Sequence, residues 1–238
     1  MSSFEYTTLL LDIEGTICPI SFVKDRLFPY FLSQLPDTLS KYQFPLTLNE
    51  SNDPLLPILL QFPESVIKSQ LALKNYITSL VEQDIKDPTL KQLQGFIWEH
   101  GYTTGLISAP LYEDVIIALQ KWKNQNKKVY IYSSGSIKAQ KLLMNNVESH
   151  GDLSHLISGW FDTTIGKKIE PESYFNILKD IDMIDKANDV LFLSDNPLEI
   201  IAGNSAGLNS IIVKREGNAP LTGENEKLKS IDNFDVLF

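Results

Sequence analysis

Polar side chains follow three apolar segments of this sequence, each at the point where the segment ends. They are Asp12 and Glu14 after residues 6–11, Ser133 and Ser134 after residues 129–132, and Asp195 after residues 190–193. Carboxylates can act as nucleophiles or bind a hard metal ion, and hydroxyls can hold the oxygens of an anion. The plain alternative for Asp12 is a turn residue, because Asp and the nearby Gly15 both favour turns. Asp12 alone is therefore ambiguous, and the other two segments decide its interpretation.

The elements that position these groups are predicted to be buried parallel strands separated by helices. After Pro110 the apolar spacing predicts helices over 112–124, 136–145, 172–181 and 198–206 and strands over 129–132, 190–193 and 210–213. Strands joined through helices are normally parallel, so their carboxyl ends meet at one edge of the sheet, where open α/β sheets bind ligands. This convergence favours Asp12 as a functional carboxylate.

The stretch between the first strand and Pro110 has a different pattern. From Phe22 to about Ser108 the apolar residues recur at helical spacing, and prolines at 29, 36, 45, 54, 57 and 63 break the first half into short pieces. We therefore expect an α/β core formed by residues 1–21 and 109–238, with a helical cap formed by residues 22–108. The polar residues 216–225 are expected to form a loose segment.

Composition excludes several classes of function. The net charge of −9 argues against nucleic acid and anionic membranes as partners, because both require a basic surface. The N-terminus has no basic region followed by a long apolar stretch, and no segment reaches the length of a membrane helix. The single Cys18 indicates a reducing compartment. We expect a monomer located in the cytoplasm, with the nucleus open as a second compartment.

The order of acid, hydroxyl, lysine and acid along the chain resembles the motif order of the haloacid dehalogenase superfamily of aspartate-nucleophile phosphatases. A closer similarity is carried by the segments Asp12–Thr16, Pro19–Asp25, Leu27–Tyr30, Leu93–Gly95 with Trp98, Gly101-Tyr102, Tyr130–Leu143, Phe161–Thr163 and Gly166–Lys168. In these segments, and over nearly its whole length, the chain resembles the acireductone-forming enolase-phosphatases of methionine salvage. The first motif departs from the usual superfamily pattern, because Glu14 stands where a second Asp is common.

The resemblance implies a fold and a reaction. The fold is an α/β, Rossmann-like parallel sheet of the haloacid dehalogenase type with an inserted helical cap. The substrate is a small phosphorylated diketone, 2,3-diketo-5-methylthiopentyl-1-phosphate, which is enolised and then dephosphorylated through an aspartyl-phosphate. Asp12 is the implied nucleophile, and Glu14 is the proposed acid and base.

Charge repulsion at the predicted edge calls for a cation. Asp12, Glu14 and Asp195 would repel one another and an incoming phosphate, since two like charges 4 Å apart cost about 4 kcal/mol at an effective dielectric constant near 20. Oxygen ligands with room for water and phosphate favour magnesium over zinc. We expect one Mg²⁺ per chain, bound by Asp12, Asp195 and Glu14, and the resemblance implies that Glu14 binds through its backbone carbonyl.

Other polar residues have roles that compete with simpler ones. Ser133 and Ser134, with amides at the following helix start, can bind phosphate, whereas Ser136 is expected to cap that helix. Lys168 and Lys167 both precede Pro171, and charge alone cannot separate them; the resemblance selects Lys168 as the phosphate-binding lysine. Glu199 is expected to hold the lysine or the waters of the metal ion, with an exposed helix acid as the alternative.

Three other functions are compatible with parts of this pattern. The nearest is a capped phosphatase for another small phosphomonoester, without the enolase step. A dehalogenase would use the same aspartate on carbon and needs no metal ion, which leaves Glu14 and Asp195 unexplained. A signalling receiver module would keep its phosphate, but receivers are about 120 residues long and lack a cap.

Overall fold

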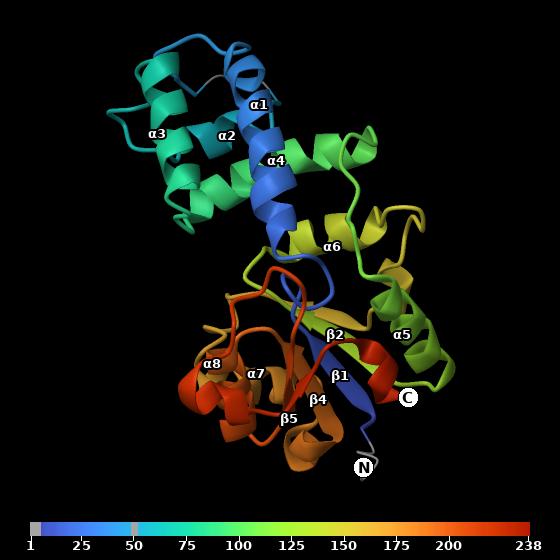
Figure 1. Cartoon of the computed structure of the whole chain (residues 1–238). Helices are drawn as coiled ribbons and strands as arrows, with labels where there is room; N and C mark the ends of the chain where they lie inside the picture. Colours follow the sequence, from blue (N-terminus) through green and yellow to red (C-terminus); the bar gives the residue numbers. More distant parts are fainter. Residues whose placement is uncertain (1–5, 49–51) are drawn as a thin grey trace. The chain divides into compact units, whose positions relative to one another are not determined.

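The chain folds into two compact units in a computed structural model that describes residues 6–48 and 52–238 (Figure 1). One unit comprises Met1–Phe22 with Ser108–Phe238, and the other comprises Val23–Ile107. The discontinuous unit contains the sheet, and the second unit is helical.

The sheet has six parallel strands in the order β3-β2-β1-β4-β5-β6. Their bounds are β1 Thr8–Leu11, β2 Lys128–Tyr132, β3 Gly159–Phe161, β4 Val190–Ser194, β5 Asn209–Val213 and β6 Ser230–Ile231. The predicted α/β fold with a parallel sheet is confirmed, and the four strands expected from apolar runs are present. The short strands β3 and β6, at the two edges of the sheet, were not predicted because neither contains an apolar run of strand length.

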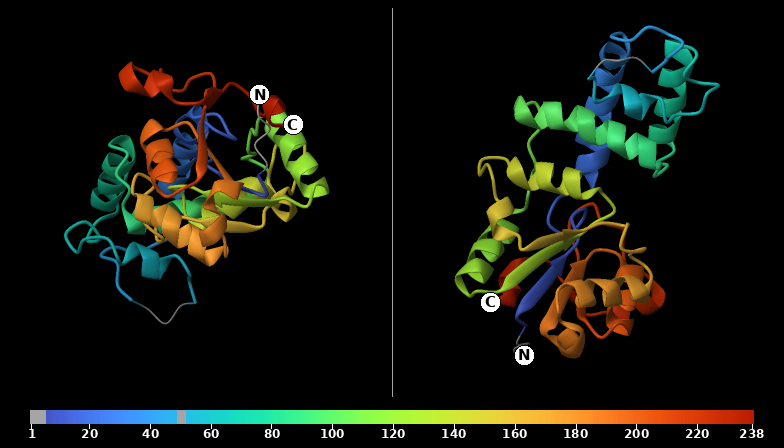
Figure 2. Two further views of the ribbon diagram at one scale, coloured as in Figure 1. Left: turned by 90° about the horizontal axis from the view of Figure 1, so that it is seen from below. Right: turned by 180° about the vertical axis from the view of Figure 1, so that it is seen from behind.

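Helices cover the sheet on both sides, which explains the unbroken apolar character of its central strands. The helices are α5 Glu113–Asn124, α6 Ile137–Asn145, α7 Pro171–Asp180 and α8 Pro197–Ser205. Right-handed crossovers from β1 outward to β3 place α5 and α6 on one face, and the return through β4 to β5 places α7 and α8 on the other (Figure 2). All four residues of β1 are therefore buried.

Aromatic side chains fill the layer between the sheet and α7. The Tyr174 ring lies 5.6 Å from the Tyr132 ring and 5.1 Å from the Phe192 ring, measured between centroids. All three side chains are fully buried. This packing fixes the first turn of α7 against β2 and β4, close to the carboxyl edge of the sheet.

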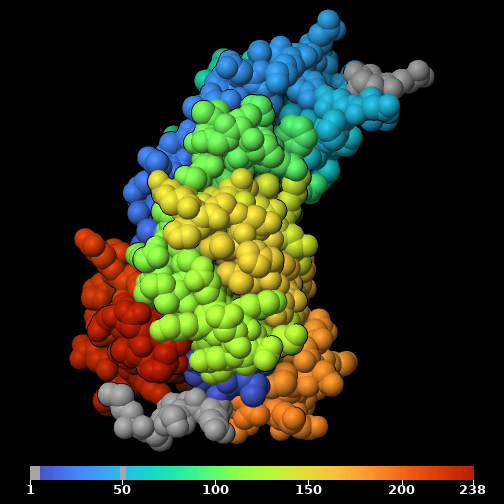
Figure 3. Space-filling model, turned by 90° about the vertical axis from the view of Figure 1, so that its right-hand side faces the viewer, coloured from blue at the N-terminus to red at the C-terminus, as the bar shows by residue number. Residues whose placement is uncertain are grey.

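The segment after β5 packs against α5. Figure 3 shows α5 (light green) beside the last residues of the chain (red). Trp122 of α5 contacts the Phe234 and Phe238 rings at centroid distances of 5.8 and 6.1 Å. The expectation of a loose segment over 216–225 is wrong in part, because the Asn218 side chain donates hydrogen bonds to two backbone carbonyls and a 3₁₀ turn spans Gly223–Lys227.

The helical unit contains α1 Phe28–Leu39, α2 Leu56–Leu59, α3 Gln70–Glu82 and α4 Pro88–Thr103, preceded by a π-helical turn over Val23–Leu27. Its helices begin at local signals that the sequence contains: Ser69 and Asp87 cap α3 and α4, and Pro88 opens α4. Trp98 and Tyr102 are buried within this unit, and the Trp98 indole donates to the Leu27 carbonyl at 3.0 Å. Across the described residues, no helix combines the length and apolar character needed to span a membrane.

Candidate active site

The register of the sheet brings the first and last acidic positions to the same edge. β1 lies between β2 and β4, with Leu11 opposite both Ile131 and Leu193. Asp12 follows directly, and its backbone N–H donates to the Leu193 carbonyl at 2.9 Å. Asp195 follows β4 at the same edge. The convergence expected from the strand ends is therefore present.

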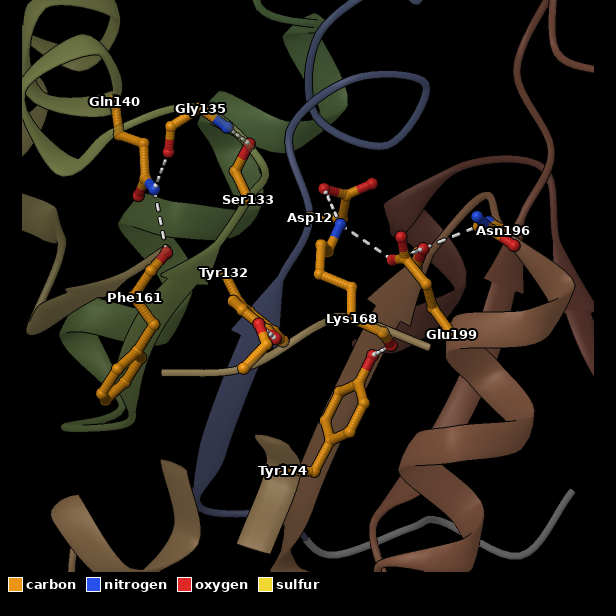
Figure 4. Close-up of polar contacts among 12 residues, drawn as sticks. Asp12, Tyr132, Ser133, Gly135, Gln140, Phe161, Lys168, Tyr174, Asn196 and Glu199 are labelled. Atoms are coloured by element: carbon orange, nitrogen blue, oxygen red, sulfur yellow. Dashed lines mark hydrogen bonds and ion pairs between the residues drawn. The ribbon is translucent and has the colours of Figure 1, made fainter. Parts of the chain in front are cut away.

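A buried lysine joins two carboxylates at this edge. The Lys168 Nζ atom lies 2.5 Å from Asp12 Oδ1 and 2.8 Å from Glu199 Oε2. Figure 4 shows Lys168 between the two acids, with the second Asp12 oxygen directed away from it. The side chains are only 8–9% exposed, and the Ser194 hydroxyl donates to Glu199 at 2.7 Å. Of the roles considered for Glu199, the contact with the lysine is observed, and the exposed helix acid is excluded because the side chain is buried.

Three hydroxyl groups hold the loop that carries Lys168. Tyr132 donates to the Gly166 carbonyl at 2.9 Å, Ser173 to the Lys167 carbonyl at 2.7 Å, and Tyr174 to the Lys168 carbonyl at 2.6 Å. With these successive carbonyls fixed, the Lys168 side chain points to Asp12. The Lys167 side chain is 74% exposed and pairs with Glu170. The structure thus separates two lysines that charge alone could not.

Charge and burial shift the pKa values of the site in different directions. Burial lowers the pKa of the Lys168 ammonium, but the charges of Asp12 and Glu199 outweigh burial, so its pKa is raised. Burial and the charge of Asp12 raise the pKa of Glu199 to about 7. Burial, Asp12 and Glu14 raise the pKa of Asp195 to about 7, although Lys168 opposes the shift. The site therefore holds more acid than its one lysine can neutralise.

The serines after β2 are arranged as a tight turn. Ser133 is buried, and its hydroxyl accepts the Gly135 N–H at 3.2 Å. The predicted cap is confirmed, because Ser136 accepts from the Ala139 N–H at the start of α6. Asp162 accepts from the Ile137 N–H at 3.1 Å. Two amides at this helix start are thus already bonded within the chain, which leaves less of the helix terminus for phosphate than expected.

The turn after Asp12 depends on glycine. Gly15 has φ of +73°, and a Cβ atom there would lie 2.5 Å from Asp195 Oδ2. Its N–H donates to the Cys18 carbonyl at 2.8 Å. Any larger residue would be strained and would collide with the carboxylate. Glu14, which is partly exposed, lies in sequence between Asp12 and Gly15.

Sequence reasoning missed two residues that bond to this turn, Arg215 and Asn218. Arg215 Nε donates to the Thr16 carbonyl at 3.2 Å, and Asn218 Nδ2 donates to the Gly15 carbonyl at 2.9 Å. Asn218 lies in the polar segment 216–225, and Arg215 directly precedes that segment. Composition alone suggests a loose loop there. The available signal was the pair of basic residues, Lys214 and Arg215, that follows the apolar end of β5.

The charges at this edge can be compared with the needs of a metal ion. Among residues 6–48 and 52–238, no three His, Cys, Asp or Glu side chains are grouped so as to hold one. Magnesium commonly takes only one or two carboxylates and completes its shell with water and phosphate. Asp12 and Asp195 meet that requirement, and a buried oxygen near Asp195, Asn218 Oδ1, has no hydrogen-bond partner. The donor set therefore fits Mg²⁺ with two carboxylates, and it does not fit a site built from three.

A parallel sheet with a buried aspartate and lysine at its carboxyl edge defines a class of aspartate-based hydrolases. A family model described as haloacid dehalogenase-like hydrolase matches residues 6–207. The enolase-phosphatase E1 of Komagataella phaffii is 51% identical over 97% of this chain and 98% of its own length. The enolase-phosphatase E1 of Debaryomyces hansenii is 52% identical over 94% of this chain and 92% of its own length. The crystal structure of the UTR4 protein of Saccharomyces cerevisiae is similar, with a TM-score of 0.83 and 45% identity over 98% of this chain and all of that one. The chain therefore belongs to the enolase-phosphatase E1 family of haloacid dehalogenase-like hydrolases.

Proposed function

We propose that this chain is an enolase-phosphatase that converts 2,3-diketo-5-methylthiopentyl-1-phosphate into the acireductone 1,2-dihydroxy-3-keto-5-methylthiopentene and inorganic phosphate, in methionine salvage. The observation that carries this function is similarity over the full length to relatives named enolase-phosphatase E1. The buried Asp12–Lys168 pair at the carboxyl edge of the sheet supports the phosphatase half. The substrate is a small phosphorylated molecule, and a phosphatase lacking the enolase step is the less favoured alternative.

The phosphatase half follows from the contacts of Asp12. Its second oxygen attacks phosphorus in line, the bond from phosphorus to the ester oxygen breaks, and an aspartyl-phosphate forms. Lys168, fixed by Glu199, offsets the charge of the phosphate, while the Ser133 and Ser134 hydroxyls hold its oxygens. Water then attacks the acyl phosphate and releases inorganic phosphate.

Glu14 is the proposed proton carrier. It gives a proton to the leaving oxygen in the first half of the reaction and takes one from the attacking water in the second. Glu14 follows the nucleophile by two residues in sequence, and it is partly exposed, so its proton can exchange with solvent. The longer side chain of Glu extends reach by one methylene compared with Asp.

A bound Mg²⁺, one per chain, would neutralise the phosphate oxygens and stabilise negative charge developing on the diketone. Asp12 and Asp195 would hold it with the backbone carbonyl of Glu14. The elevated pKa of Asp195 supports this assignment, because its carboxylate lacks sufficient positive charge nearby. We also propose that the enzyme is a monomer of the cytoplasm, in keeping with its acidic charge and its buried Cys18.

The direct test is phosphate release from the synthetic diketone, measured together with the ultraviolet absorbance of the enediol product. Both signals should require Mg²⁺. Turnover of a panel of phosphomonoesters without turnover of the diketone would instead select the simple phosphatase. A phosphoenzyme that persists for minutes would support a receiver, and dehalogenation without metal would support a dehalogenase.

Asp195→Asn should make the protein more stable at pH 8 when no metal ion is present, by about 1 to 3 kcal/mol after allowing for solvent screening. The pKa of Asp195 is raised to about 7 in the folded protein, from an ordinary value of 3.8. Folding therefore favours the protonated acid: the penalty is absent below about pH 4, grows between pH 4 and 7, and is complete above pH 7. Urea unfolding of both proteins at pH 5 and pH 8 measures this difference.

Asp185→Asn is the matched control for this experiment, because Asp185 is an exposed acid in the turn that precedes β4, at the opposite end of the strand from Asp195, and its removal should leave the pH profile unchanged. Calorimetry should also detect no Mg²⁺ uptake by Asp195→Asn. Parallel stability profiles for wild type and Asp195→Asn would contradict the proposed charge imbalance.

A further inference from the structure

Two residues after β5 bond to consecutive carbonyls in the turn that follows Asp12. Asn218 Nδ2 donates to the Gly15 carbonyl at 2.9 Å, and Arg215 Nε donates to the Thr16 carbonyl at 3.2 Å. On its other side the turn is closed by the hydrogen bond from Gly15 N–H to the Cys18 carbonyl. The turn that carries Glu14 is thus fixed from a segment more than 190 residues away in sequence.

Arg215 is the anchor of this contact. Its guanidinium is 7% exposed and binds both oxygens of Asp114, at 3.1 and 2.8 Å. Asp114 also accepts the Phe234 N–H at 2.7 Å, and the guanidinium lies 4.3 Å from the centre of the Tyr112 ring. A bidentate pair held from several sides has little freedom to move, so Arg215 gives the segment a fixed position.

The hydrogen bonds of Asn218 determine the orientation of its amide. Nδ2 uses one proton for the Gly15 carbonyl and the other for the Val213 carbonyl, at 3.2 Å. Oδ1 must therefore point the other way, and it is buried without a partner. A Cβ on Gly15 would lie 2.8 Å from this oxygen and 2.5 Å from Asp195 Oδ2, so the two oxygens border the same small space.

Asp195 and Asn218, which border this space, also line a cavity. A cavity of about 350 Å³ is lined by residues that include Asp195, Arg215 and Asn218. A buried acceptor that water can reach costs less free energy when a bound water donates to it. Asn218 Oδ1 is therefore placed to accept a hydrogen bond from a water molecule next to Asp195.

We propose that Asn218 is a positioning residue: it fixes the Gly15 carbonyl, and its amide oxygen orients a water of the cation held by Asp12 and Asp195. This inference deepens the proposed function and rests on it. Residues that orient metal ligands from outside the ligand set typically change metal affinity or activity 10- to 100-fold when replaced. Asn218 does not touch the substrate's reacting atoms in this assignment.

The test compares Asn218→Ala with Asn209→Ala. Asn209 begins β5, at the opposite end of the strand, and its amide also donates to a backbone carbonyl, that of Asn188. We expect Asn218→Ala to raise the Kd for Mg²⁺ about 10- to 100-fold by calorimetry and to lower kcat with little change in KM. Hydrogen exchange at the amides of residues 13–18 should quicken in the metal-free protein. Asn209→Ala should match wild type in all three measurements.

Each outcome separates this inference from the proposed function. An unchanged Kd for Mg²⁺ in folded Asn218→Ala overturns the positioning role, even if the wild type turns over the diketone. A raised Kd supports it even if the diketone is not a substrate, because calorimetry uses Mg²⁺ alone. If wild type binds no Mg²⁺, unchanged exchange at residues 13–18 overturns the positioning role and faster exchange supports its backbone part. Asn218→Ser, which keeps a donor but is shorter, takes the place of Asn218→Ala if the latter fails to fold.

Discussion

Asp12→Asn should reduce phosphate release at least about 10⁴-fold, the order of loss seen when a nucleophile is removed from an enzyme that forms a covalent intermediate. The amide cannot form the aspartyl-phosphate, and it also removes the negative partner that Lys168 contacts at 2.5 Å. Rapid-quench measurements with radiolabelled substrate should find labelled protein in wild type and none in Asp12→Asn. Enolisation should be monitored in the same samples through the absorbance of the enediol product.

The matched control is Asp162→Asn, an acid near the same edge whose oxygens bond to the Ile137 and Thr164 amides rather than to Lys168. It should keep the labelled intermediate. Label that persists in Asp12→Asn would exclude Asp12 as the nucleophile. If enolisation survives the loss of Asp12 while release does not, the two halves of the reaction use different groups.

Lys168→Met should both inactivate and destabilise the protein. Removing the ammonium leaves Asp12 and Glu199 buried without their shared positive charge, and breaking a buried ion pair in this way typically costs about 3–5 kcal/mol. Loss of a positive charge directed at the phosphate should lower kcat by about 10³-fold. Chemical denaturation and steady-state kinetics measure the two effects.

Two companion variants make the interpretation specific. Lys167→Met changes the neighbouring lysine, which is exposed and pairs with Glu170, and should cost little in either measurement. The double variant Lys168→Met with Glu199→Gln also removes one of the two buried carboxylates left without a positive partner. It should recover part of the lost stability without recovering activity. A double variant no more stable than Lys168→Met would refute the account of the buried pair.

The central strands and the place of Asp12 were predictable because burial on both faces produces unbroken apolar runs. Val190–Leu193 and Val129–Tyr132 are such runs, and parallel pairing then brings Asp195 and Ser133 to the edge where Asp12 lies. Ser136 was predictable as a cap because the signal is local. Each of these features depends on neighbours in the sequence or on one general rule of sheet topology.

The contacts made by Arg215 and Asn218 could not be predicted in this way. Their partners are the backbone carbonyls of Thr16 and Gly15. Every residue has such a carbonyl, so the pattern of side chains does not identify the partner. The strands β3 and β6 were not predicted for a related reason: they are three and two residues long, and they form only by pairing with the strand beside them. Charge alone left Lys168 and Lys167 equivalent, and the resemblance selected Lys168; the physical reason for that choice is visible only in the three hydroxyl contacts that hold the loop.

The two carboxylates around Lys168 also disfavour a side reaction of its amine with ketones. A neutral amine carries a lone pair and condenses readily with ketones to form an imine, and enzymes that exploit this chemistry lower the pKa of a lysine. Here Asp12 and Glu199 act in the opposite sense, so that Lys168 stays an ammonium ion. A protein that receives a vicinal diketone can thereby keep a lysine within reach of it without becoming trapped as a Schiff base.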